Sequence, residues 1–224
     1  MKKSITALLI VAILASVFAL SCYAEPSTPS QAKRIALTFD DGPHPKQTRA
    51  ILDVLDRYGI KATFFVIGLN AKNYPSALSE VLARGHEIGN HTTTHPHAAK
   101  LNACAFRDEI CDCEQEIFAQ TGIKCTLFRP PEGAMTDTMR RVIKELGYTN
   151  VLWTLDTRDW AHTPPEQISD YIIQNAKNGD IILMHDYIGA NSPTVQALER
   201  FIPVLLQQGF TFVTVGELLG QRNQ

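Results

Sequence analysis

Five short polar clusters in this chain carry the residue types from which a hydrolytic metal site can be built. Each follows an apolar run, and they lie at residues 38–42 (TFDDG), 91–95 (HTTTH), 129–133 (RPPEG), 156–160 (DTRDW) and 183–185 (LMH). Two imidazoles and one carboxylate can hold a divalent ion and leave a coordination position open. The remaining acids, arginine and histidine can move protons beside it, which predicts water attack on an amide or ester.

The first cluster places two acids side by side, Asp40 and Asp41, directly before Gly42. An Asp-Gly pair is also common in simple turns, and for this cluster alone that interpretation stays open. Because neighbouring side chains diverge at the end of a strand, two adjacent acids can serve different tasks. One can ligate a metal ion while the other faces the water that the ion holds.

The second cluster contains His91 and His95, whose i, i+4 spacing lets two imidazoles share one cation on a helical turn. The three threonines between them can bond the loop backbone and help to define that turn. Two polar loop histidines without a common ligand are the alternative. His44 and His97 lie near prolines, and we expect both at the surface or at the edge of a substrate site.

The other three clusters add an arginine, an aspartate and a histidine. Two prolines after Arg129 fix the backbone and help to direct its fork inward, where it can hold a carboxylate; a rigid turn is the alternative. Asp159, Trp160 and His185 each carry little information alone, and a buried histidine satisfied by its neighbours is the simpler interpretation of His185. Their occurrence together with the ligand-like clusters favours one common site.

Strand-like runs alternate with amphipathic helices along the chain. The pattern predicts strands near residues 35–39, 62–67, from about 87, 126–128, 148–155, 181–184 and 210–215, and helices near residues 46–58, 74–84, 105–120, 139–146, 164–177 and 195–207. Seven such units predict an α/β fold, a distorted (β/α) barrel of about seven parallel strands in a single domain; a doubly wound open sheet is the alternative. Each cluster begins where a predicted strand ends, the edge that carries active sites in both folds.

Residues 1–24 have the features of a bacterial secretory signal, with Lys2 and Lys3 before an apolar stretch and a small-x-small site at residues 22–24. An uncleaved membrane anchor is the alternative, because the stretch approaches spanning length. Cys22 also allows a lipoprotein, although the residues before it match that pattern poorly. We expect residues 25–33 to be a flexible lead-in, residues 34–221 to be one domain, and the protein to be exported: secreted, periplasmic or cell-wall-associated, without stable membrane association after cleavage.

The net charge limits the expected binding partners, and the cysteine content bears on possible disulfides. Without residues 1–24 the chain has 19 basic and 23 acidic residues, a net charge of about −4, and no basic stripe, so we expect no nucleic-acid partner and a monomer. Four cysteines remain, Cys104, Cys111, Cys113 and Cys125, and an even number in an exported protein allows disulfides. A Cys113–Cys125 bridge could close if the next strand folds back along its helix, whereas a four-cysteine zinc site lacks a C-x-x-C pair.

In order and spacing, the five clusters resemble the motifs of the polysaccharide deacetylase family with a NodB-homology domain, carbohydrate esterase family 4. The resemblance covers about residues 34–219, and all five family motifs have a match. It implies a distorted (β/α) barrel and hydrolysis of acetyl groups from sugars, chiefly N-acetylglucosamine polymers. The implied partner is therefore an N-acetylated glycan substrate.

By position, the resemblance also implies a role for each matched residue. The implied metal ligands are Asp41, His91 and His95. The implied catalytic residues are the base Asp40, which Arg129 orients, and the acid His185, which Asp159 holds; the implied substrate-binding residues are Pro130, Glu132, Trp160 and Leu183. Many members have tyrosine at the position of Glu132. Because the family's oxyanion donor there is a backbone N–H, the change bears on glycan preference rather than on catalysis.

Together these features predict an exported, metal-dependent N-deacetylase that acts on peptidoglycan or chitin-like oligosaccharides and releases acetate. Zinc is the expected metal, and cobalt or nickel would also suit the ligands. An O-deacetylase of acetylated xylan would use the same site with an alcohol leaving group. The complete set of base, acid and ligands disfavours a non-catalytic glycan-binding protein, and the absence of the glutamate of His-Glu-x-x-His disfavours a metallopeptidase.

Overall fold

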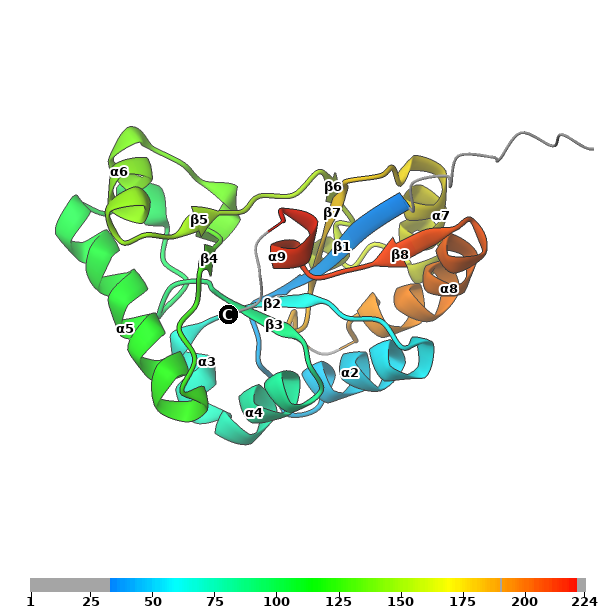
Figure 1. The fold of residues 1–224 in the computed structure, drawn as a ribbon, viewed down its shortest axis with the longest axis horizontal. Helices are drawn as coiled ribbons and strands as arrows, with labels where there is room; N and C mark the ends of the chain where they lie inside the picture. Colours follow the sequence, from blue (N-terminus) through cyan, green and yellow to red (C-terminus); the bar gives the residue numbers. More distant parts are fainter. Residues whose placement is uncertain (1–32, 190, 221–224) are drawn as a thin grey trace, which may run out of the picture. The chain divides into compact units, whose positions relative to one another are not determined.

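Strands and helices alternate through the part of the chain that the computed structural model describes, residues 33–189 and 191–220 (Figure 1). The strands are β1 (Lys33–Asp40), β2 (Thr63–Val66), β3 (Glu87–Asn90), β4 (Leu127–Phe128), β5 (Thr149–Asn150), β6 (Leu155–Asp156), β7 (Ile181–His185) and β8 (Phe210–Phe212). The helices are α2 (Gln47–Tyr58), α3 (Gly68–Asn73), α4 (Pro75–Ala83), α5 (Ala103–Thr121), α6 (Asp137–Glu145), α7 (Pro165–Asn175), α8 (Thr194–Gln207) and α9 (Val215–Leu218), with 3₁₀ turns η1 (Ala98–Lys100), η2 (Pro131–Gly133) and η3 (Asp159–Ala161).

The predicted secretory signal and nearly all of the predicted lead-in lie outside the described residues. Within the described ranges, no helix combines the length and the apolar character needed to cross a membrane.

Seven parallel strands curl into a half-barrel in a single domain, which confirms the predicted fold class. The strand order is β5-β4-β3-β2-β1-β7-β6, and β8 pairs with the first residues of β1. The long strand β1 lies in the middle, between β2 and β7. Its last residue, Asp40, is in register with Phe65 of β2 and His185 of β7. The first and last polar clusters are therefore neighbours, although they lie far apart in the sequence.

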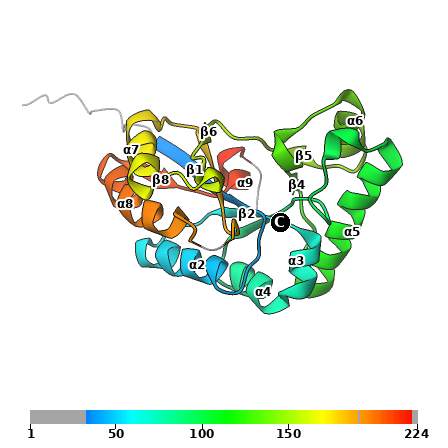
Figure 2. The same ribbon diagram turned by 180° about the vertical axis from the view of Figure 1, so that it is seen from behind.

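Alternate residues of β1 are buried on the two faces of the sheet, as the period of a strand requires. Ile35, Leu37 and Phe39 belong to the larger apolar cluster, which also contains residues of α2, α7 and α8, helices that lie outside the sheet (Figures 1 and 2). On the other face, Ala36 packs in a small cluster with Phe65, Leu127, Val151 and Val215. These apolar side chains occupy this face of the sheet, whereas the polar clusters lie at the carboxyl ends of the strands.

The predicted strand at residues 148–155 is wrong as a single element, because the structure divides it into β5 and β6. Strand β5 pairs with β4 and strand β6 pairs with β7, so the two lie at opposite ends of the sheet. Residues 151–154 connect them, with Val151 buried in the inner cluster and Leu152 exposed. Apolar residues therefore occur in this connection as well as in the strands, and the sequence pattern alone does not separate the two.

The bounds of one helix and one strand also differ from the prediction, because of a proline and a helix cap. The predicted helix at residues 74–84 begins at Pro75, a favoured first helical position, and the separate helix α3 precedes it. The predicted last strand ends at Phe212, because Thr214 starts α9 with a capping box in which its side chain and that of Glu217 bond each other's backbone N–H.

The four cysteines of the described ranges are free thiols, and the Cys113–Cys125 bridge that the sequence allowed is not formed. The Cys113 thiol is buried and donates to the carbonyl of Val66 at 3.4 Å. Burial raises the pKa of both Cys113 and Cys125, which favours the uncharged thiol.

Candidate active site

Residues from all five polar clusters line one cavity of about 490 Å³ at the carboxyl ends of the strands. The lining residues are Asp40, Asp41, His91, His95, Glu132, Trp153, Asp156, Trp160, Leu183 and His185. Of the residues that the sequence assigns to a site, Arg129 and Asp159 lie behind this surface and are fully buried. Pro130 is also buried and is not among the lining residues, so the structure does not place it at the surface of this cavity.

Asp41, His91 and His95 form a triad whose ligand atoms all lie within 4.8 Å of one another. Asp41 Oδ1 is 3.5 Å from His91 Nε2 and 3.4 Å from His95 Nε2. Ligand atoms about 2.0–2.2 Å from a tetrahedral ion are themselves about 3.3–3.6 Å apart, so the spacing fits. Asp41 Oδ1 is buried and has no hydrogen-bond partner among the described residues. A buried oxygen of this kind suits a cation, and the triad is therefore suitable for a divalent metal ion.

The ring of His91 is oriented by a contact on its far side. Its Nδ1 lies 2.8 Å from the carbonyl oxygen of Arg129, to which a protonated Nδ1 donates, and this tautomer leaves the Nε2 lone pair toward Asp41. Ligand histidines commonly donate their second ring N–H in this way, which fixes both tautomer and ring direction.

The expected helical turn between the two histidines is wrong. Residues 91–97 are irregular, and Thr92 and His95 have positive φ angles of 68° and 54°. The loop is held from α5, because one carboxylate oxygen of Glu109 accepts the N–H groups of Thr93 and Thr94, each at 2.9 Å. The two imidazoles therefore converge through a strained loop with an external anchor, and the i, i+4 spacing arises without a helix.

Asp40 faces the same cavity but has a different partner from Asp41. Arg129 Nη1 donates to Asp40 Oδ1 at 2.7 Å, while Asp40 Oδ2 lies 3.8 Å from His91 Nε2. The two adjacent acids thus diverge, as the sequence suggested. Asp41 turns toward the imidazoles, whereas Asp40 bridges the arginine and the edge of the triad.

The guanidinium of Arg129 is fully buried and is held on several sides. Nη1 also donates to Thr38 Oγ1 at 2.8 Å, and the remaining contacts go to the carbonyls of Val151 and Leu152 at 3.3 and 3.4 Å. Its Cζ lies 4.1 Å from the ring centre of Phe65, at the top of the inner apolar cluster. Burial is the largest influence and lowers the pKa of Arg129, but the Asp40 carboxylate opposes this loss. An arginine in this setting stays charged, and its guanidinium fixes the direction of the Asp40 carboxylate.

His185 is paired with an aspartate that is fully buried. Its Nδ1 lies 2.8 Å from Asp159 Oδ1, and its backbone N–H donates to Asp159 Oδ2 at 2.8 Å. The backbone N–H of Trp160 and the Oγ1–H of Thr194 donate to the same carboxylate at 2.9 and 2.8 Å. Burial alone would lower the pKa of His185, but the hydrogen bond and charge of Asp159, with Asp40 and Asp41 nearby, raise it to about 9. A protonated imidazole therefore faces the cavity.

Asp186, the residue after His185, is a buried acid that the sequence interpretation missed. Its backbone N–H donates to the Asp40 carbonyl at 3.1 Å, and its Oδ2 accepts from Thr48 Oγ1 at 2.6 Å. A Cβ at Gly42 would lie 2.0 Å from that oxygen, so this position requires glycine. Burial raises the pKa of Asp186 to about 7. An acid directly after a strand-end histidine was the signal that could have identified it.

The outer wall of the cavity is formed by Glu132, Trp153 and Trp160. Trp153 packs against Gly133 so closely that a Cβ there would lie 2.8 Å from the indole. Glu132 has a positive φ of 58°, and its Oε1 lies 2.9 Å from Nδ1 of His97, whose side chain is exposed at the surface, one of the two positions expected. Trp153 was missed because nothing in its local sequence distinguishes it from a strand residue.

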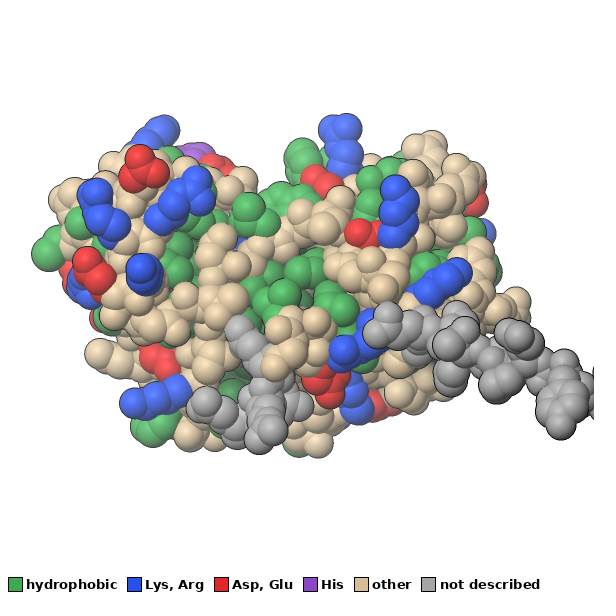
Figure 3. All heavy atoms as spheres, turned by 45° about the horizontal axis from the view of Figure 1, so that its top comes forward, with side chains coloured by type: hydrophobic (Ala, Val, Ile, Leu, Met, Phe, Trp, Pro, Cys, Tyr) green, Lys and Arg blue, Asp and Glu red, His purple; other side chains and the backbone are tan. Residues whose placement is uncertain are grey.

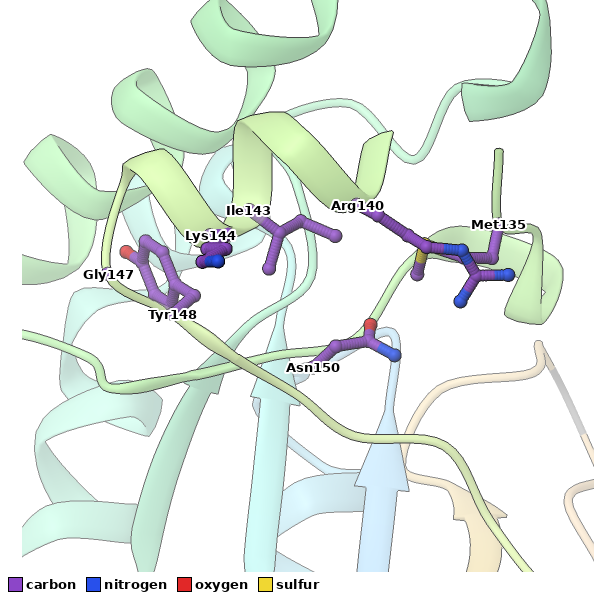
Figure 4. Close-up of a pocket in the computed structure, with 7 residues that line it drawn as sticks. All are labelled: Met135, Arg140, Ile143, Lys144, Gly147, Tyr148 and Asn150. Carbon is purple, nitrogen blue, oxygen red and sulfur yellow. The ribbon is translucent and has the colours of Figure 1, made fainter. Parts of the chain in front are cut away.

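A second cavity, of about 340 Å³, lies beside α6 and lacks the chemistry of the first (Figure 4). It is lined by Met135, Arg140, Ile143, Lys144, Gly147, Tyr148 and Asn150. In the space-filling view, lysine and arginine side chains gather over this region of α5 and α6 (Figure 3). The lining holds no carboxylate or imidazole, so the residues suitable for a metal ion lie in the cavity at the strand ends.

Comparison with known proteins supports the same assignment. The sequence model of the polysaccharide deacetylase family matches residues 27–151. The chain is 43% identical over 199 residues to a peptidoglycan-N-acetylglucosamine deacetylase of Bacillus cereus, covering 88% of this chain and 93% of the relative. It is 38% identical to the peptidoglycan-N-acetylmuramic acid deacetylase PdaC of Bacillus subtilis over 87% of this chain, but it spans only 40% of that longer protein.

Among solved structures, the Bc1960 peptidoglycan N-acetylglucosamine deacetylase superposes with a TM-score of 0.83 at 34% identity, covering 88% of this chain and 92% of the other. Both the sequence and the fold are thus shared over nearly the whole of the described part of the chain. The chain belongs to the polysaccharide deacetylase family and is a carbohydrate deacetylase.

Proposed function

We propose that this deacetylase hydrolyses the acetamide of N-acetylglucosamine-type sugars in peptidoglycan or chitin-like oligosaccharides, and that it is exported to act there. The proposal depends chiefly on one observation. In a single cavity beside a metal-ligand triad, a carboxylate held by a buried arginine (Asp40) lies next to an imidazole held by a buried aspartate (His185). A base and an acid poised together are what amide hydrolysis needs.

The base step uses Asp40. Arg129 occupies Oδ1, so Oδ2 is left facing the triad, where it can accept a proton from water that attacks the acetyl carbon. The Glu132 backbone N–H donates to the oxyanion that forms on the carbonyl oxygen.

The acid step uses His185. Its Nδ1–H is committed to Asp159, so the proton on Nε2 is free for the departing sugar nitrogen. An unprotonated amine is a poor leaving group, and this transfer completes cleavage of the carbon–nitrogen bond. Trp160 and Leu183 line the same cavity and supply the apolar wall for the acetyl methyl group.

For the metal we propose zinc, held by Asp41 Oδ1 and the Nε2 atoms of His91 and His95. When bound, a divalent ion supplies a Lewis acid that polarises the acetyl carbonyl and lowers the pKa of water. Cobalt or nickel would suit the same donors.

Acetate release from matched glycans tests the proposal. The purified protein is stripped of metal, repleted with zinc, and given chitooligosaccharides, peptidoglycan fragments and acetylated xylan, with products identified by mass spectrometry. We expect metal-dependent release from the first two substrates. Preferential release from acetylated xylan would identify an O-deacetylase instead, and glycan binding without any acetate after repletion would indicate a non-catalytic protein.

A further inference from the structure

Glu132 places a carboxylate on the outer wall of the cavity, at its mouth. Its side chain is 52% exposed, and its one ion-pair partner in the described chain is His97, which is 67% exposed. None of the described residues that line the cavity is a lysine or an arginine. The carboxylate of Glu132 therefore faces the substrate side of the cavity without a lysine or an arginine among the described lining residues.

Two of the three other carboxylates of the cavity, Asp40 and Asp41, are compensated in ways that Glu132 is not. Asp40 is paired with the buried Arg129 at 2.7 Å. Asp41 belongs to the metal-ligand triad. Asp156 has no charged partner among the described residues, but its Oδ1 accepts the backbone N–H of Arg158 at 2.8 Å and lies 3.4 Å from the indole nitrogen of Trp160. Glu132 is therefore an exposed carboxylate of the cavity that neither an arginine nor the metal-ligand triad compensates, and its field acts on a substituent near the acetamide.

Substrate chemistry makes this charge selective. In N-acetylmuramic acid the lactyl ether is attached at the ring carbon next to the one that bears the acetamide. When the acetamide enters the cavity, a free lactyl carboxylate must therefore remain near the cavity mouth. N-acetylglucosamine has a hydroxyl at that position and meets no such repulsion.

We propose that Glu132 is a specificity-determining residue that disfavours sugars with a carboxylate beside the reacting acetamide and so directs this deacetylase to N-acetylglucosamine rather than peptide-free N-acetylmuramic acid. The inference rests on the proposed N-deacetylase function. Like charges at a protein surface separated by one side-chain length change a rate constant by about threefold to fivefold at moderate salt, and high salt should reduce the effect.

A charge cycle isolates this interaction. The substrates are two peptide-free muramyl oligosaccharides that differ only in the lactyl group, one with the free acid and one with the carboxamide. The wild type and Glu132→Gln are compared by kcat/KM for both. We expect the wild type to prefer the carboxamide about threefold to fivefold more strongly than the variant does. The metal and the shape of the lactyl group act equally on both enzymes and drop out of this ratio of ratios.

Glu199→Gln is the matched control, because it changes net charge by the same amount on α8, where Glu199 pairs with Arg57. It should give the wild-type preference. Where muramyl turnover is too slow to follow, the two compounds are compared as inhibitors of chitooligosaccharide hydrolysis, and the same ratio of inhibition constants is expected.

Equal preference in the wild type and Glu132→Gln, with both enzymes active on chitooligosaccharides, would overturn the assignment of Glu132 and leave the proposed function standing. Absence of acetate release from every N-acetylated substrate, including neutral chitooligosaccharides, would instead reject the proposed function itself. A salt-independent preference would also contradict an electrostatic origin.

Discussion

Two ion pairs face the cavity from neighbouring strands, and they have opposite polarity. At the end of β1, a buried cation holds a carboxylate: Arg129 on Asp40. At the end of β7, a buried carboxylate holds an imidazole: Asp159 on His185. In both pairs the supporting side chain has no exposed surface, whereas the supported group lines the cavity. The base and the acid are thus both held by partners that the solvent does not reach.

The two pairs differ in how far apart, across the sheet, the strands lie that supply their two members. Asp159 follows β6, which is adjacent to β7, so neighbouring strands suffice to form its pair. Arg129 follows β4, and β3 and β2 lie between β4 and β1 in the sheet. Its contact with Asp40 therefore requires the sheet to curl. We infer that the Arg129–Asp40 pair, the base side of the cavity, depends on the curl of the half-barrel. The Asp159–His185 pair, the acid side, depends on local strand pairing.

The largest loss of activity is expected when the metal-ligand triad, beside which the base and the acid lie, is broken. Asp41→Ala deletes the oxygen that lies 3.5 and 3.4 Å from the two imidazoles, so metal and activity should be lost together, with activity falling by more than about 10⁴-fold. Metal content by mass spectrometry and acetate release are measured on the same sample. Full metal occupancy and turnover in this variant would contradict the assignment of Asp41 as a ligand.

Asp40→Asn breaks the base side alone and should come next. The amide keeps the shape of the side chain but cannot take a proton, so kcat should fall by about 10³-fold while metal content stays at the wild-type level. Rates and metal content are compared with those of Asp41→Ala. Turnover close to that of the wild type would reject Asp40 as the base.

Asp159→Asn weakens the acid side and should reduce activity by about tenfold or more at neutral pH. The Asp159 hydrogen bond and charge help to raise the pKa of His185 to about 9, so the variant's His185 should lose its proton at lower pH. Because protonated His185 is the active form, activity falls as pH rises through this pKa. The high-pH limb of kcat/KM should therefore move down by about one to two pH units.

Stability provides an independent check on the sign of this shift. A pKa raised in the folded state stabilises the fold fully below the unfolded value near 6.5, and the contribution fades as pH rises through about 9. The melting temperatures of the wild type and Asp159→Asn should therefore converge at high pH. An unmoved high-pH limb in Asp159→Asn would show that Asp159 does not control the acid.

The contrast between the two sides also explains how much the sequence could predict. Hydrophobic periodicity is local, so it identified the alternating elements and placed each cluster at a strand end. It could not identify the division of residues 148–155, because β5 and β6 find partners at opposite ends of the sheet. Nor could spacing distinguish a helical turn from the loop at residues 91–95, since Thr92 and His95 are not glycines and gave no sign of positive φ.

The same limit applies to the site. Most residues that touch the cavity lie in recognisable clusters, as do Arg129 and Asp159 directly behind them, but the residues that hold these clusters from other elements do not. Glu109 anchors the histidine loop from α5, and Thr194 supports Asp159 from α8. These are ordinary residue types whose role arises only when distant elements pack. Supporting groups of this kind are therefore found from structure, whereas the reacting groups can be predicted from sequence.

The smallest effects are expected from a matched pair of threonines, one on each side. Thr38 accepts from Arg129, and Thr194 donates to Asp159, both at 2.8 Å. In Thr38→Val, a buried arginine donor and the Ile182 carbonyl lose their partner, so we expect a loss of about 1–3 kcal/mol in unfolding free energy and an unchanged high-pH limb.

In Thr194→Val, the Asp159 carboxylate keeps its bonds from His185 and Trp160, so stability should fall by only about 1 kcal/mol. Losing one donor concentrates the negative charge of Asp159 on His185, which should raise the pKa of His185 and move the high-pH limb upward by a few tenths of a unit. Denaturant unfolding and pH–rate profiles measure both variants. If Thr38→Val moved the high-pH limb as much as Thr194→Val, the two ion pairs would be one coupled network, and the division of the cavity into a base side and an acid side would fail.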